Sequence, residues 1–296
     1  MSRLYCIDAS IYIFRAYFSM PDRWFNEQGY GLNAVYGYAR FLVNFIREAR
    51  PTYLMAAYDE SLGSGYRHEL YPDYKSNRVL PDEALAFQLG ACRRLGELMG
   101  IASYACERFE ADDYIAAAAR LAGQEGLAVT VVSRDKDLAQ VLRAEHDEWW
   151  DYAAARRLRK AEWEAGQNLR VEQVADWLAL MGDSIDAIPG VPGIGRKTAA
   201  VLLGHFGDID GLYAGLDRLE EAPVRGAVRL RQALLEHREQ VYLARSLTRL
   251  NDRALRLRSC KPFLFRCRVE DLRGYLLEIG CGEAWTDRLL KDMESA

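Results

Sequence analysis

The chain has 296 residues, half of them hydrophobic, so it can bury one large core or two moderate ones. No apolar run approaches the roughly 18 residues of a membrane helix, and the N-terminus MSRLYCIDAS is too short and polar for a signal peptide. The six cysteines contain no C-x-x-C pair, which argues against a zinc site and favours reduced thiols. We therefore expect a cytoplasmic protein with no membrane partner.

The first half of the chain alternates between predicted strands and predicted helices. Residues 4–7 form an apolar run that ends at Asp8, residues 53–58 form a second that ends at Asp59, and residues 128–133 form a third just before Asp135. Helical patterns separate them at 34–49 and 85–99. This alternation predicts a parallel sheet, in which ligands bind beyond the carboxyl ends of the strands.

Acidic side chains gather in short clusters at the ends of these strands and at the starts of helices. Glu110, Asp112 and Asp113 open one helix, where acids are also favourable as caps, so capping is the alternative interpretation for that cluster. Carboxylates brought together at one edge would repel one another unless hard cations such as Mg²⁺ or Mn²⁺ bind between them. The candidate set is Asp8, Asp59, Glu110, Asp112, Asp113, Asp135, Asp137, Asp183 and Asp186.

The formal net charge is −4, and without those nine acids it would be +5. A negative total therefore does not exclude a phosphate-containing partner, because the acids are concentrated in the candidate metal site. The pattern indicates metal-dependent phosphoryl chemistry.

From Val171 onward the pattern is helical and includes a glycine- and proline-rich turn. Residues 188–198 read IPGVPGIGRKT, followed by the helical segment AAVLLGHF. A helix, glycine-rich hairpin and second helix can bind a DNA backbone through amides at the helix start, with Arg196 and Lys197 adding charge. A simple helix connector is the alternative, but one glycine would suffice for it. Residues from about 220 to 296 are Arg-rich and helical, with a short strand expected at 263–267.

Seven motifs in chain order resemble the 5′ nuclease (flap endonuclease) family, especially the 5′–3′ exonuclease domain at the N-terminus of bacterial DNA polymerase I. They are IDAS at 7–10, AVYGYARFL at 34–42, YDE at 58–60, YRHELYPDYKSNR at 66–78, FEADD at 109–113, SRDKDLAQVL at 133–142 and GDSIDAIPGVPGIGRKTA at 182–199. No polymerase sequence follows them here, so we expect a stand-alone member.

The resemblance implies an α/β, PIN-like 5′ nuclease fold with a mostly parallel central sheet flanked by helices. It implies a catalytic domain over 1–170 with a helical arch near 66–85. It also implies a helical DNA-binding region over 171–296, with a helix-hairpin-helix (H2TH-type) motif at about 183–206.

The resemblance also divides the candidate residues by role. Asp8, Asp59, Glu110 and Asp112 would hold a first metal ion, and Asp183 and Asp186 the second. Asp135 and Asp137 would lie between the ions, and Asp113 would be shared or adjacent. It implies that Lys75 and Arg78 lie on one helix face at the scissile phosphate, that Tyr74 stacks on a base, and that Arg67 contacts a phosphate. Duplex DNA would be bound by Gly193, Gly195, Arg196, Lys197 and Thr198. The backbone carbonyls of Val191 and Ile194 would bind K⁺ or Na⁺.

The expected activity is two-metal hydrolysis of DNA phosphodiesters at a 5′ end, nick or 5′ flap, in replication or repair. Two departures from the family pattern, Arg134 before Asp135 and Ala187 after Asp186, leave a second hypothesis open. That hypothesis is a DNA-structure-binding protein with a weakened second metal site. A PIN-type ribonuclease would be shorter and lack the hairpin, and a purely structural acidic protein would leave the ordered motifs unexplained.

Overall fold

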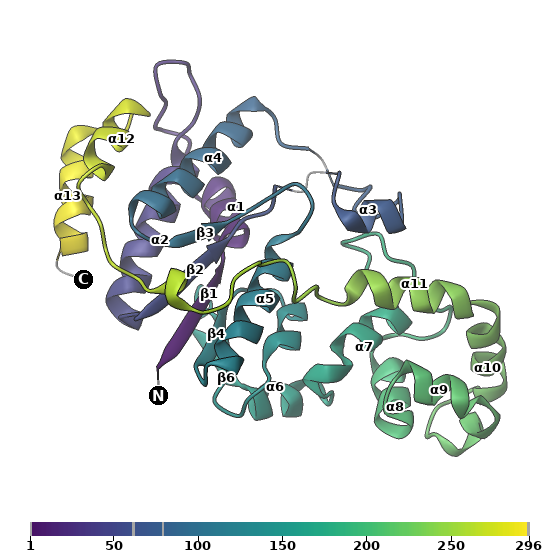
Figure 1. The fold of residues 1–296 in the computed structure, drawn as a ribbon. Coiled ribbons are helices and arrows are strands. Elements are labelled where there is room, and N and C mark those ends of the chain that lie inside the picture. The colour runs from purple at the N-terminus through teal and green to yellow at the C-terminus, as the bar shows by residue number, and fades with distance from the viewer. Residues whose placement is uncertain (1, 61–62, 79, 295–296) are drawn as a thin grey trace.

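The computed structural model describes residues 2–60, 63–78 and 80–294 and contains a six-stranded sheet with the order β3-β2-β1-β4-β5-β6 (Figure 1). The predicted strands are confirmed as β1 (Arg3–Asp8), β2 (Tyr53–Ala57) and β4 (Ala128–Val132). The sequence reasoning missed β3 (Ala102–Tyr104), β5 (Glu148–Asp151) and β6 (Arg156–Arg159). All neighbouring pairs are parallel except β5 with β6.

Helices cover both faces of the sheet because the central strands are apolar on both sides. Tyr5 and Ile7 of β1 pack with α1 (Ala9–Ser19), α2 (Asn33–Ala49) and α4 (Glu83–Leu98). The intervening Leu4 and Cys6 pack with α5 (Ala111–Gln124) on the opposite face. This alternation follows from the two-residue period of a strand, and it explains why the strands read as continuous apolar runs.

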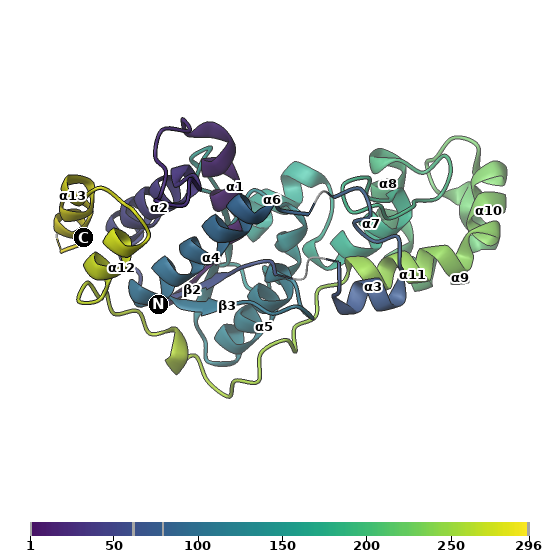
Figure 2. The same cartoon turned by 90° about the horizontal axis from the view of Figure 1, so that it is seen from above.

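A second hydrophobic core lies in the helical half of the molecule, beyond α6 (Lys160–Gln167). It is formed mainly by α7 (Val174–Met181), α8 (Arg196–Phe206), α9 (Ile209–Ala214), α10 (Ala227–Glu236) and α11 (Arg238–Thr248). Shorter 3-10 turns span Asp137–Val141, Val171–Gln173, Leu216–Glu221 and Lys261–Phe263. Figure 2 shows this unit beside the α/β unit.

The expected helical region of 171–296 does not stay in one place. After α11 the chain returns across the α/β unit and ends in α12 (Leu272–Glu278) and α13 (Glu283–Glu294), which lie beside α2 (Figure 1). Trp285 of α13 packs on Tyr36 of α2, with ring centroids 4.1 Å apart. The strand expected at 263–267 is wrong, because only an isolated bridge between Tyr53 and Leu264 forms there.

The segment near 66–85, where a helical arch is expected, is only partly helical within the described residues. The segment holds the five-residue helix α3 (Tyr66–Leu70), then turns, and α4 begins at Glu83. None of the described helices combines the length and apolarity needed to cross a membrane.

Candidate active site

The carboxyl ends of β1 and β4 are tied together by hydrogen bonds that place three acids at one edge of the sheet. Asp8 ends β1, is 4% exposed, and accepts a hydrogen bond of 2.7 Å from the Ser133 hydroxyl just after β4. The Asp135 amide donates to the same hydroxyl at 2.9 Å, and the Asp137 amide donates to the Asp135 carboxylate at 2.8 Å. Trp149 of β5 fixes this loop by donating from its ring nitrogen to the Asp135 carbonyl at 2.7 Å.

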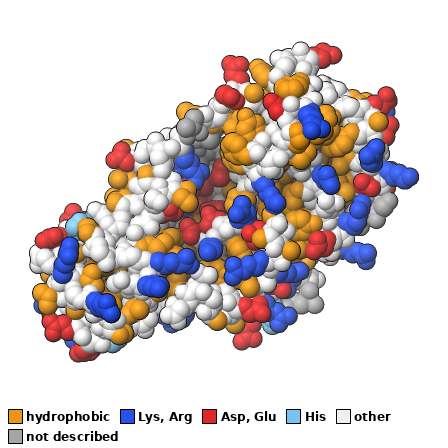
Figure 3. Space-filling view, turned by 180° about the vertical axis from the view of Figure 1, so that it is seen from behind, with side chains coloured by type: hydrophobic (Ala, Val, Ile, Leu, Met, Phe, Trp, Pro, Cys, Tyr) orange, Lys and Arg blue, Asp and Glu red, His pale blue; other side chains and the backbone are white. Residues whose placement is uncertain are grey.

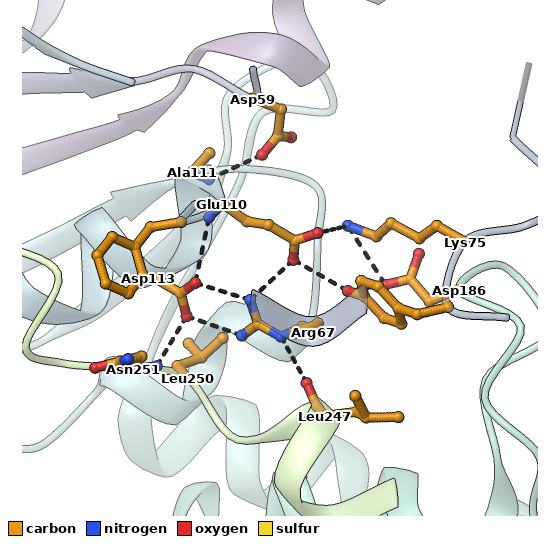
Figure 4. Close-up of polar contacts among 12 residues, drawn as sticks. Asp59, Arg67, Lys75, Glu110, Ala111, Asp113, Asp186, Leu247, Leu250 and Asn251 are labelled. Carbon is orange, nitrogen blue, oxygen red and sulfur yellow. Dashed lines mark hydrogen bonds and ion pairs between the residues drawn. The ribbon is translucent and has the colours of Figure 1, made fainter. Parts of the chain in front are cut away.

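Asp59 connects the end of β2 to the start of α5. Its amide donates to the Ser10 hydroxyl at 2.9 Å, and its carboxylate accepts from the Ala111 amide at 2.8 Å. An acid is stabilised at a helix N-terminus by the helix dipole and free amides. This contact brings the beginning of α5, with Glu110 and Asp112, to the same edge of the sheet (Figure 4).

The gathered carboxylates raise one another's pKa. Burial, followed by the charge of Asp59, raises the pKa of Asp8 to about 8. Burial, followed by the charge of Asp135, raises the pKa of Asp137 to about 8 and that of Asp112 well above its usual value. The pKa of Asp59 and that of Asp135 are also raised, chiefly by burial. Loss of water and proximity of like charge both oppose ionisation, so this edge is electrostatically suited to bind cations.

The acids come near one another without meeting at a single point. In the described parts of the chain, no three His, Cys, Asp or Glu side chains are already arranged to hold a metal ion. The donors are nevertheless of the right chemistry, because carboxylate oxygens are the ligands that Mg²⁺ and Mn²⁺ prefer.

Glu110 and Asp186 are paired with cationic side chains from the segment after α3 (Figure 4). The Lys75 ammonium lies 2.5 Å from Glu110 and 3.8 Å from Asp186, and Arg78 lies 2.7 Å from Asp186. Burial raises the pKa of Glu110, but Lys75 and Arg67 outweigh it and the pKa is lowered. Both predicted phosphate-binding cations therefore lie at the acidic edge.

Lys75 and Arg78 do not share a helix face, contrary to the sequence prediction. Lys75 has a positive φ of 54°, and its amide donates to the Asp186 carbonyl at 2.9 Å. A left-handed residue cannot continue a right-handed helix, so the segment forms turns here. Tyr74 is corrected as well: it is 3% exposed, and its hydroxyl donates to Glu110 at 3.0 Å, so its ring is not available for base stacking.

Arg67 and Asp113 form a buried pair, which corrects the role predicted for Arg67 and leaves Asp113 adjacent to Glu110, whose amide donates to it at 3.2 Å. The guanidinium, 2% exposed, contacts both Asp113 oxygens at 2.8 Å and donates to the Leu247 carbonyl at 2.8 Å. Asp113 is fully buried and also accepts from the Asn251 amide at 2.8 Å. With these groups satisfied, Arg67 connects α3, α5 and α11 and is not free for phosphate, and Asp113 shares the Arg67 guanidinium with Glu110 (Figure 4).

The glycine-rich hairpin after α7 is held by close backbone contacts. Asp183 and Ile188 exchange two backbone hydrogen bonds of 2.7 and 2.8 Å. A side chain at Gly190 would place its Cβ 2.3 Å from the Met181 backbone, so only glycine fits. This geometry places Asp183 and Asp186 between the acidic edge and the hairpin.

The predicted DNA-contacting residues lie where the hairpin leads into α8. Gly193 has a φ of 84° and Gly195 caps α8, which begins at Arg196. The Arg196 guanidinium already has partners within the protein, because it lies over the Trp177 ring and donates a hydrogen bond to Gln167. Lys197 is exposed and Thr198 half-buried. Val191 and Ile194 are buried, and the Val191 carbonyl accepts from the Ile194 amide at 3.0 Å.

A cavity of about 330 Å³ opens beside the acidic edge, and part of its lining was not predicted. Asp59, Lys75, Arg78 and Glu110 line one part of it, and Phe14 of α1 lines another. Phe14, like the supporting hydroxyls of Ser10 and Ser133, was missed by sequence reasoning. The serines sit within two residues of predicted strand ends, and that proximity was the available signal.

Comparison with protein families gives two adjoining matches. A model described as "5'-3' exonuclease, N-terminal resolvase-like domain" matches residues 3–169, and one described as "5'-3' exonuclease, C-terminal SAM fold" matches residues 169–261. The chain belongs to the 5'-3' exonuclease family. It is 31% identical to a 5'-3' exonuclease of Aquifex aeolicus over 227 residues, which cover 74% of this chain and 75% of that protein.

Other relatives are longer. The chain is 35% identical to the DNA polymerases I of Rhizobium leguminosarum and Bacillus caldotenax, matching 83% of its own length in each case. It spans about a quarter of their lengths, 24% and 27%.

Solved structures share the fold of this family member. The T5 D15 protein co-crystallised with metal ions matches with a TM-score of 0.69 at 20% identity, covering 99% of this chain and 98% of that one. The catalytic core of Rad2 in complex with DNA substrate matches with a TM-score of 0.64 at 14% identity, covering 99% and 92%.

Proposed function

We propose that this member of the 5'-3' exonuclease family hydrolyses DNA phosphodiesters near a 5′ end, on nicked or branched DNA, with divalent cations. The observation that carries the proposal is the set of mutually repelling carboxylates at the carboxyl edge of the parallel strands, directly beside Lys75 and Arg78. The named activity of the Aquifex relative supports the reaction, and the DNA complex of Rad2 supports the substrate class.

Two groups of carboxylates would hold the cations. Asp8, Asp59, Glu110 and Asp112 form the group around β1, β2 and α5, Asp183 and Asp186 form the group toward the hairpin, and Asp135 and Asp137 would lie between the two ions. We propose Mg²⁺ or Mn²⁺, two ions in all. When bound, such ions supply a water of lowered pKa and stabilise the leaving oxygen.

The cationic side chains position the substrate phosphate in this proposal. Lys75 and Arg78 would contact nonbridging oxygens, where negative charge develops during cleavage. Their contacts with Glu110 and Asp186 already direct them toward the acidic edge. Phe14, on the wall of the adjoining cavity, provides apolar surface for the neighbouring nucleotide.

The hairpin would hold duplex DNA beside the cleavage point. Gly193, Gly195 and Lys197 are exposed at the start of α8, where free backbone amides can bind phosphate. We propose that the Val191 and Ile194 carbonyls bind K⁺ or Na⁺ in that complex.

The test is cleavage of end-labelled flap, nicked, overhang and single-stranded DNA across Mg²⁺ and Mn²⁺ titrations. Asp112→Ala and Asp135→Ala should reduce cleavage to background, whereas Asp217→Asn, which changes an acid on the remote helical unit, should cleave normally. Full cleavage in EDTA, or in both alanine variants, would contradict the metal mechanism. Tight flap binding without cleavage in either metal would favour the DNA-structure-binding alternative.

A further inference from the structure

An exposed arginine lies at the rim of the acidic edge, in the loop that follows β4. Arg134 stands between Ser133, whose hydroxyl donates to Asp8, and Asp135, a proposed metal ligand. The Arg134 side chain is 62% exposed. Figure 3 views the molecule from behind and shows acidic side chains in a central hollow, with Lys and Arg side chains around it. A positive charge at this rim is within reach of a nucleic-acid strand held at the acidic edge.

The backbone on both sides of Arg134 is fixed by hydrogen bonds. The Ser133 amide donates to the Trp150 carbonyl of β5 at 3.1 Å, and the Asp135 amide donates to the Ser133 hydroxyl at 2.9 Å. The ring nitrogen of Trp149 donates to the Asp135 carbonyl at 2.7 Å. Because its attachment point is fixed, Arg134 loses less conformational freedom when it binds a ligand than a residue of a mobile loop would.

The Arg134 guanidinium is only loosely held by the protein. Within the described residues its one ion pair is with Asp151 at the end of β5, where the nearest atoms are 3.7 Å apart, and it donates no hydrogen bond there. The Asp151 carboxylate already accepts from the Ala154 amide at 3.1 Å. By contrast, Arg78 lies 2.7 Å from Asp186. A long, exposed ion pair contributes little stability, so the guanidinium can exchange Asp151 for a phosphate at low cost.

Arg134 and Lys75 belong to different sides of the acidic edge. In the sheet, β1 lies between β2 and β4, and the usual strand spacing places β2 and β4 roughly 10 Å apart. Lys75 contacts Glu110 at the start of α5, which adjoins the end of β2, whereas Arg134 follows β4 and pairs toward β5. This separation favours a different phosphate for Arg134 from the one that Lys75 and Arg78 contact.

We propose that Arg134 binds a phosphate of the cleaved DNA strand next to the one that Lys75 and Arg78 contact. The inference rests on the proposed function and deepens it, because it adds a third cation to the substrate contacts of the site. A guanidinium donates hydrogen bonds in a planar fork that matches the oxygens of a phosphate. The departure from the family pattern at Arg134 is then a gained substrate contact and not the sign of a weakened site.

The test pairs one residue with one phosphate. Flap DNAs are prepared in which a neutral methylphosphonate replaces a single phosphate at each position around the cleavage point, and Kd is measured in Ca²⁺. For the wild-type chain, one neutral linkage beside the cleaved one should weaken binding about tenfold, as expected for a lost charge-assisted hydrogen bond. In Arg134→Gln the same linkage should have no effect, because its partner is already missing, while other neutral linkages should weaken binding as they do in the wild-type chain.

Three comparisons separate this contact from a general effect of charge or folding. Arg134→Lys keeps the charge and should stay sensitive to that linkage. In Arg134→Gln the slope of log Kd against log salt should fall by about 1. The matched control is Arg266→Gln, which removes an exposed arginine beside Gly100 at the opposite, amino edge of the sheet and should behave as the wild-type chain. A thermal melt of each variant, and calorimetric Mg²⁺ binding without DNA that is no weaker in Arg134→Gln, show that the fold and the metal site are intact.

Two results would overturn the inference: the same sensitivity to each neutral linkage in the wild-type chain and in Arg134→Gln, or a uniform loss of affinity with no linkage singled out. If the wild-type chain cleaves flap DNA but gives either result, the proposed function stands and the Arg134 contact fails. If one linkage depends on Arg134 but the chain never cleaves in Mg²⁺ or Mn²⁺, the contact stands and the nuclease proposal fails. A wild-type chain that binds none of these DNAs would contradict both.

Discussion

The Lys75 ammonium lies between Glu110 and Asp186, at distances of 2.5 and 3.8 Å, and so can reach a phosphate held at the same edge. We expect Lys75→Ala to lower the single-turnover cleavage rate by about 10² to 10³, because one lost charge contact to the developing transition state has that effect. DNA affinity should change far less.

The matched control for Lys75 is Asn77→Ala, in the same turn, where the side-chain amide donates to the Ser184 carbonyl at 2.9 Å. The two readouts are the single-turnover rate and the Kd measured in Ca²⁺. Equal losses in rate and affinity for Lys75→Ala would make Lys75 a binding residue only.

Ala187 follows Asp186 with a positive φ of 56°, which is unfavourable for alanine and better tolerated by asparagine. We expect Ala187→Asn to raise the free energy of unfolding by about 0.5 to 1 kcal/mol. Ala187→Val should lower it, because a β-branched residue is worse in this conformation. Urea unfolding of the wild-type chain and the two variants measures the order of their free energies of unfolding. A valine variant as stable as the asparagine variant would contradict the argument.

At the residue scale, the sequence predicted the acidic edge but not the partners of its residues. Asp8, Asp59 and Asp135 could be placed because strand ends are visible in the apolar runs. The pairing of Arg67 with Asp113 could not, because it joins residues 46 positions apart whose contact depends on tertiary packing. An arginine in a DNA-binding family is equally suited to phosphate and to a buried carboxylate.

At the scale of elements, the Arg67 guanidinium fastens α3 to α5 and to the end of α11. Arg67→Met should destabilise the protein by about 3 to 5 kcal/mol, because it leaves the buried Asp113 charge without its partner. It should also make residues 71–78, which follow α3, more sensitive to protease. Urea unfolding and limited proteolysis measure the two effects.

The comparison for Arg67 is Arg108→Ala, which breaks the exposed ion pair between Arg108 and Glu69 of α3 and should cost less than about 1 kcal/mol. If the two substitutions cost the same, the buried pair would not be what anchors α3.

Element prediction succeeded for long periodic segments and failed where tertiary contacts decide the local backbone. The helices at 34–49 and 85–99 were found within two residues of α2 and α4. The turn at Lys75 depends on a hydrogen bond to Asp186, more than a hundred residues later, so no local pattern could reveal it. β3 has only three residues and β6 is almost entirely arginine, so neither has a strand-like hydrophobic pattern.

At the scale of the whole molecule, the raised carboxylate pKa values make stability depend on pH. Asp8 and Asp137 have a pKa of about 8 when folded and near 4 when unfolded, so the folded state binds more protons between these values. Stability therefore falls as pH rises from about 4 to about 8. In EDTA, the melting temperature should be higher at pH 5 than at pH 8.

Divalent cations should reverse much of that loss, because they replace the protons between the carboxylates. Addition of Mg²⁺ at pH 8 should raise the melting temperature, and isothermal titration in two buffers should show proton release on binding. In Asp137→Asn, the decline in stability between pH 5 and pH 8 should be smaller. A melting temperature that is flat with pH in EDTA would contradict the argument.

The division of the chain was the least predictable feature at this scale. The helical pattern after Val171 is uniform enough to suggest one region, yet α12 and α13 return to pack on α2. Tyr36 and Trp285 meet across 249 positions, and an aromatic residue gives no sequence sign of which distant ring it will contact. The position of α12 and α13 is set by the packing of their apolar side chains against those of α2.

The antiparallel strand β6 ends the sheet, and it has a consequence for the chain in concentrated solution. An unpaired strand edge offers backbone donors and acceptors to any other extended chain. Arg156, Arg157 and Arg159 are all exposed along this one, so a second copy approaching it would set like charges against one another. This edge of the sheet therefore carries its own electrostatic barrier to intermolecular β-pairing.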